Sequence, residues 1–177
     1  MGVHSFADEI WEDAPASIIR RIPQNCGVSI AWHIWRLARI EDMTMNVLIA
    51  DRPQLYDREN WAERIQSPAY DTGNAMDMDE ARVLSEAVNI EALRAYRIAV
   101  GRATREIVQQ IPPGEMKQKV DPARLQRLKD SGAVVPEAYG IVEYWGKRAF
   151  AGLLLMPPTR HNLVHINKAL QLKARRH

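Results

Sequence analysis

Three histidines in this chain have the residue type and spacing of a metal site. His161 and His165 lie four residues apart, and His33 lies far upstream. On a helix, residues at i and i+4 differ by about 40° around the axis, and their Cβ atoms are roughly 6 Å apart. Both imidazoles can therefore reach one ion. A histidine from a facing helix would complete a three-nitrogen site with room for water or a substrate.

The surroundings of His33 favour a metal site over a chance spacing or a packed core histidine. On a helical wheel, His33 lies in the middle of an apolar stripe that must face the core. The outer side of the same segment carries Trp35 and three polar residues: Arg39, Asp42 and Asn46. Trp35 is either a partner contact or an exposed aromatic. Three of the five histidines on inward faces are hard to explain by packing alone.

The segment that carries His161 and His165 has two apolar edges. Val164, Ala169 and Leu172 lie beside the histidines, and Leu163, Ile166 and Leu170 lie on the opposite side. A helix that is apolar on both sides is sandwiched between two layers. The second layer is either another helix of this chain or a partner subunit.

Composition narrows the class of protein. The 177 residues predict one domain, residues 1–177, with an ordinary soluble balance of 26% charged and 46% apolar residues. A net charge of +2 and the lack of a basic stripe argue against nucleic-acid binding. No apolar run approaches the ~20 residues that span a bilayer. The single cysteine, Cys26, and the absence of a secretory signal pattern predict a cytoplasmic location, and we assign Cys26 no catalytic role.

Helical periodicity dominates the chain, and no run of alternating strand residues occurs. The expected helices span residues 5–21 in two pieces separated at Pro15, 29–51, 60–65, 80–110, 122–130, 136–155 and 159–174. Ser29 and Thr159 are the expected N-caps of the two histidine helices. The helix expected over 80–110 has two positions where it could be interrupted, near Asn89 or near Gly101. Long helices with connections of mixed length predict an all-α bundle with long crossover connections and short extra helices.

The pattern His33-Ile-Trp-Arg-Leu-Ala-Arg-Ile-Glu41-Asp42, followed by Arg160-His161-Asn-Leu-Val-His165, resembles the DinB-like superfamily of bacterial helical metalloproteins. The resemblance covers residues 27–172. It implies an up-down-down-up four-helix bundle, frequently a homodimer, with one divalent metal ion held by His33, His161 and His165. Members with known activity include thiol-dependent transferases and isomerases. The resemblance implies a full-length helix ahead of the one that carries His33, but only about 25 residues precede it here and Pro15 lies among them. We therefore expect the first helix to be short, altered or truncated, and His4 to be exposed to solvent.

Three neutral imidazoles would leave the ion with uncompensated positive charge and an open position. Such a site favours an anion and would deprotonate a bound thiol or acidify a bound water. Zn²⁺, Ni²⁺ and Fe²⁺ all accept imidazole, so the sequence does not choose among them. The cofactors expected are thus one divalent ion and a low-molecular-weight thiol as cosubstrate, with a small molecule as substrate.

A catalytic base is less clearly marked. Glu41 borders the inward face, where it either orients an imidazole or pairs with a nearby arginine. Glu143, Tyr144 and Arg160 are further candidates for the pocket lining, and Asn162 is expected to point away from it. The leading hypothesis is a metal-dependent thiol transferase or hydrolase. Its rival is a non-catalytic bundle with a structural or sensory metal that acts through dimerisation or partner binding.

Overall fold

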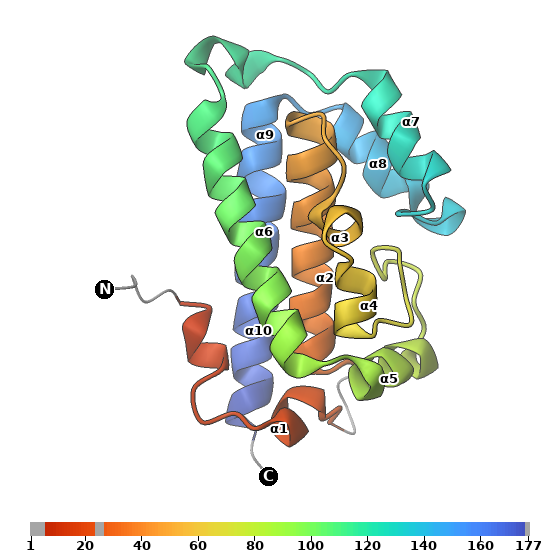
Figure 1. Ribbon diagram of the computed structural model, residues 1–177, viewed down its shortest axis with the longest axis vertical. Helices are drawn as coiled ribbons and strands as arrows, with labels where there is room; N and C mark the ends of the chain where they lie inside the picture. Colours follow the sequence, from red (N-terminus) through yellow and green to blue (C-terminus); the bar gives the residue numbers. More distant parts are fainter. Residues whose placement is uncertain (1–5, 24–26, 176–177) are drawn as a thin grey trace.

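Three long helical rods form the body of the protein in the computed structural model, which describes residues 6–23 and 27–175 (Figure 1). The first rod is α2 (Ile30–Asp42), which continues as the π-helix η2 (Met43–Ile49). The second is α6 (Ile90–Gln110). The third joins α9 (Phe150–Leu155), the π-helix η5 (Met156–His161) and α10 (Asn162–Ala174). The first rod packs against both others, so it is the centre of the fold.

The direction of the rods follows from the connections between them. Figure 1 shows α2 and α6 running the same way, while the α9–α10 rod runs the opposite way. Two parallel neighbours need a long crossover, and residues 50–89 supply it. This crossover holds α3 (Leu55–Arg58), α4 (Trp61–Ile65) and α5 (Met78–Ala87). Residues 111–149 form the second connection, with η3 (Pro113–Lys117), α7 (Pro122–Asp130), η4 (Pro136–Ala138) and α8 (Tyr139–Gly146).

The all-α prediction is confirmed for the described part of the chain, where the only β interaction is an isolated bridge between Lys119 and Ala149. The N-terminal segment forms two short pieces, as expected: η1 (Asp8–Ile10) packs against α10, and α1 (Ala16–Arg20) packs against α2. Cys26 and His4 lie outside the described residues.

Local capping signals fix where several helices begin. The Ser29 hydroxyl accepts the backbone N–H of Trp32 at 3.0 Å, which confirms the expected N-cap of α2. The predicted helix over 80–110 is two helices, which confirms the expected break near Asn89: α5 ends at Ala87, and the Asn89 side chain caps α6 by accepting the N–H of Ala92. The predicted helix over 136–155 is also interrupted, at residues 147–149, between α8 and α9.

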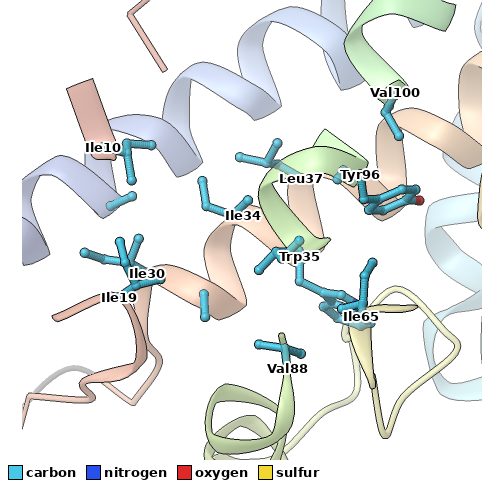
Figure 2. Close-up of a cluster of buried hydrophobic side chains, with 14 of the residues drawn as sticks. Ile10, Ile19, Ile30, Ile34, Trp35, Leu37, Ile65, Val88, Tyr96 and Val100 are labelled. Carbon is cyan, nitrogen blue, oxygen red and sulfur yellow. The ribbon is translucent and has the colours of Figure 1, made fainter. Parts of the chain in front are cut away.

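Two apolar clusters stabilise the fold. One lies around the start of α2, and Figure 2 shows its side chains from several elements, including Ile34, Trp35 and Tyr96. The other lies around η2 and contains Met43 and Trp145. Most side chains of the central rod are thus buried, as expected for a helix enclosed by neighbours.

The outer side predicted for α2 is wrong. Trp35 is fully buried, with its ring against Gly73, and the three polar residues beside it are buried as well. The crossover covers this face, and it supplies partners for the polar groups. The Asp42 carboxylate accepts four hydrogen bonds, from the backbone N–H groups of Leu55 and Tyr56, the Tyr96 hydroxyl and the Asn46 amide. Arg39 lies over the Tyr56 ring at 3.7 Å and donates to the Tyr70 carbonyl at 2.6 Å.

Candidate metal centre

The histidines come from the first rod and the third. His33 is in the first turns of α2, His161 is the last residue of η5, and His165 is in the first turn of α10. The two prolines before His161 do not interrupt the rod, because the chain takes π-helical hydrogen bonding there. Thr159 is therefore not the predicted N-cap: its hydroxyl donates to the Leu155 carbonyl at 2.5 Å.

The three predicted ligands come together. The Nδ1 atoms of His33 and His165 are 2.8 Å apart, and the centroids of these rings are 5.0 Å apart. The rings of His161 and His165 are 4.4 Å apart, centroid to centroid. His33 and His165 are buried, His161 is half-buried, and both ring nitrogens of His161 lack a hydrogen-bond partner. Buried polar atoms without partners are rare in folded proteins, so His161 needs an explanation.

The environment keeps the three imidazoles neutral. Burial, followed by the positive charges of Lys168 and Arg36, lowers the pKa of His33 to about 4. Burial and Arg36 lower the pKa of His161 to about 4, and burial with the two other histidines lowers that of His165 to about 2. Since a metal binds the neutral imidazole lone pair, the ligands need to lose no proton at neutral pH.

Three imidazoles are suitable ligands for a divalent ion, but two of their nitrogen atoms are closer together than they would be around one. Two nitrogens bound to one tetrahedral ion at 2.0–2.1 Å would be about 3.3 Å apart, whereas the Nδ1 atoms of His33 and His165 are 2.8 Å apart and within hydrogen-bond distance. Among residues 6–23 and 27–175, no three His, Cys, Asp or Glu side chains are already arranged to hold an ion. Binding would require the rings to separate by about half an ångström.

Aromatic and cationic side chains surround the histidines. The Trp32 ring lies 5.3 Å from the His33 ring and 5.9 Å from the His165 ring, centroid to centroid. The Arg36 guanidinium lies over the Trp32 ring, 5.3 Å from its centroid, and donates to the Thr72 carbonyl at 2.7 Å. Trp32 and Arg36 were not among the sequence-predicted residues. A signal existed, since Arg36 is one helical turn after His33.

Glu41 is buried but does not bond a histidine. Its Oε2 accepts the Asn162 amide at 2.5 Å and pairs with Arg97 at 3.0 Å. Asn162 follows His161 directly, so Glu41 fixes the start of α10 rather than an imidazole. The expectation that Asn162 points away is wrong, because its side chain is buried. Its amide also donates to the Pro158 carbonyl, so Asn162 links the π-helix to Glu41 on α2.

The other pocket candidates do not gather at the histidines. Glu143 and Arg160 are exposed, and Tyr144 lies against Arg148, at 4.3 Å. Figure 1 places α8, which carries Glu143 and Tyr144, at the end of the molecule opposite α1 and the start of α2. The positions of these three residues therefore do not support a role for them in binding or catalysis at the histidines.

Within the described ranges, no helix is both long and apolar enough to cross a membrane. A comparison with models of known protein families found no match, and no curated protein sequence matches this chain.

Proposed function

We propose that this chain is a divalent-metal-binding DinB-like protein that acts as a metal-dependent thiol transferase or hydrolase. The observation that carries the proposal is the meeting of three neutral imidazoles from two rods, with both nitrogens of His161 unpartnered. A packed core histidine normally satisfies its ring nitrogens with carbonyl or carboxylate groups. Here the His161 ring lies 4.4 Å from the ring of His165, centroid to centroid.

The arrangement of the rods supports a DinB-like topology. In an up-down-down-up bundle the second and third helices are parallel, and a long crossover joins them. The first two rods have this relation. They would be the second and third helices, the α9–α10 rod would be the fourth, and the short elements η1 and α1 would take the place of the first.

His33, His161 and His165 would hold the ion, which we expect to be Zn²⁺, Ni²⁺ or Fe²⁺. When bound, it would supply positive charge and an open position that lowers the pKa of a thiol or of water. The chain's own residues would bind the small-molecule substrate beside it. Trp32 covers two of the three rings and would limit the access of bulk water. Asn162, held by Glu41, would keep His161 in place.

A second candidate is a non-catalytic bundle that dimerises around a structural or sensory metal. It is favoured by three apolar side chains on the histidine rod that are about half exposed: Leu155, Leu163 and Val164. Leu163 belongs to the second apolar edge predicted from the sequence. Val164 was expected beside the histidines, and its exposure corrects that expectation. In this version the cytoplasmic homodimer, rather than an open metal position, would be the functional unit.

Metal analysis tests the proposal. The protein is purified without chelators or a histidine tag, and its metal content is measured before and after reconstitution with Zn²⁺, Ni²⁺ or Fe²⁺. We expect about one equivalent in the wild type and loss in His161→Ala, with helical content unchanged by circular dichroism. No bound metal in the reconstituted wild type would refute the proposal.

Cobalt substitution separates the two candidates. The visible absorption of Co²⁺ reports its ligands, so addition of a low-molecular-weight thiol should change the spectrum if a position is open. An unchanged spectrum at saturating thiol would leave only the structural or sensory version.

A further inference from the structure

A small pocket is lined in part by His33. Its volume is about 250 Å³, which suits a small metabolite rather than a polymer segment. Its lining comes from the chain before α2, from α2 itself and from the end of the α10 segment: Val28, His33, Lys168, Gln171, Leu172 and Arg175. A proposed metal ligand, His33, thus lies in the wall of a pocket large enough for a small molecule.

The charges around this pocket have one sign. Lys168 lines it, and its ammonium group is near enough to lower the pKa of both His33 and His165. The positive charge of Arg36 also lowers the pKa of all three histidines. Within the described residues, no Asp or Glu lines the pocket. Asp71 interacts electrostatically with Arg36.

The neutral lining residues add shape and hydrogen bonding. Gln171 is three residues after Lys168, so the two side chains are neighbours on one face of α10. An ammonium and an amide N–H side by side match the two oxygens of a carboxylate. Val28 and Leu172 supply apolar surface for a short carbon chain.

We propose that this pocket binds a small substrate or cosubstrate through its carboxylate, with Lys168 as the counter-ion and the reacting end of the molecule toward the histidines. This inference rests on the proposed function, since it names the substrate class for the same site. It also makes a claim about the metal-free protein, because Lys168 and Gln171 are present without the ion.

The test compares two thiols of similar size: mercaptoacetate, which carries a carboxylate, and 2-mercaptoethanol, which is neutral. Each is titrated into metal-free protein at low ionic strength, and the imidazole C–H signals of His33 and His165 are followed by NMR. We expect saturable shifts with mercaptoacetate and up to about fivefold weaker binding of 2-mercaptoethanol, because one exposed charge pair contributes up to about 1 kcal/mol. High salt should remove the difference.

Lys168→Gln should bring the two affinities together. Lys147→Gln removes the same charge from an exposed position near α8 and should preserve the preference. Equal binding of both thiols to the wild type, or an unchanged preference in Lys168→Gln, would overturn the inference. A parallel titration with Zn²⁺ reports on the metal separately. A protein that binds no Zn²⁺ but prefers mercaptoacetate would contradict only the proposed function.

Discussion

Asp42 offers the sharpest test of how the central rod is held. Its carboxylate is fully buried, accepts four hydrogen bonds and lies 4.0 Å from the guanidinium of Arg39, which is also fully buried. Two of the donors are backbone N–H groups at the start of α3, and a third is the hydroxyl of Tyr96 on α6. One carboxylate therefore joins three elements.

In Asp42→Asn the side chain keeps its shape, but one oxygen becomes an amide N–H₂ and the negative charge disappears. Buried donors then face another donor, and Arg39 loses its counter-charge. Removing one partner of a buried ion pair costs about 3–5 kcal/mol, and a domain's whole stability is about 5–15 kcal/mol. We therefore expect a loss of about 3–5 kcal/mol in the free energy of unfolding.

Urea denaturation followed by circular dichroism measures this loss, with the denaturant slope expected to stay constant. The control is Asp79→Asn, because the Asp79 side chain is 87% exposed and pairs with Arg82 only at the surface. The control should change stability by less than about 0.5 kcal/mol. A loss below about 1.5 kcal/mol in Asp42→Asn would contradict the charged network. It would mean that burial keeps this carboxyl group protonated in the folded protein.

Three further results are expected. Metal-free protein should lose stability as the pH falls from 6.5 to about 4. The pKa values of the buried histidines are lowered in the folded state, so the unfolded state binds more protons over this range. An unchanged midpoint of urea denaturation over this range would contradict the burial of the rings. Gly73→Ala should cost about 2 kcal/mol, since φ is +68° and the new Cβ would lie 2.8 Å from the Trp35 ring. Gly132→Ala, at a positive φ but in open space, is the control and should cost about half as much in the same urea assay. Asn162→Ala should weaken metal binding about tenfold in a chelator competition, by freeing the start of α10 from Glu41; unchanged affinity would deny Asn162 a positioning role.

Features that depend on neighbouring residues were predictable from the sequence. Ser29 caps α2 within three residues of its own position, and Asp121 likewise caps α7 by accepting the N–H of Ala123. The approach of His33 to the later pair was also predictable, since helical spacing placed all three histidines on inward faces. The same spacing could have indicated Lys168, which is one turn after His165.

Features that depend on distant segments were not predictable. The burial of Trp35 depends on contacts with residues 50–89, such as Gly73, and the pattern of this segment gave no indication of a layer over α2. The role of Asn162 depends on the π-helical hydrogen bonding before it, whereas two adjacent prolines normally indicate that a helix ends. Helical wheels assume 100° per residue, so they misplace side chains that adjoin such a segment.

The π-helix before His161 also separates two evolutionary constraints on one continuous rod. A π turn takes up about one residue more than an α turn, so the loss of one residue there would make it an ordinary α turn and leave the downstream side chains close to their present directions relative to α9. The loss of one residue from a regular α-helical part of the rod between α9 and His161 would instead rotate both histidines together by about 100° relative to α9. The π turn therefore tolerates a change in length that the rest of the rod does not, and homologous chains are best aligned with a gap allowed between Met156 and His161.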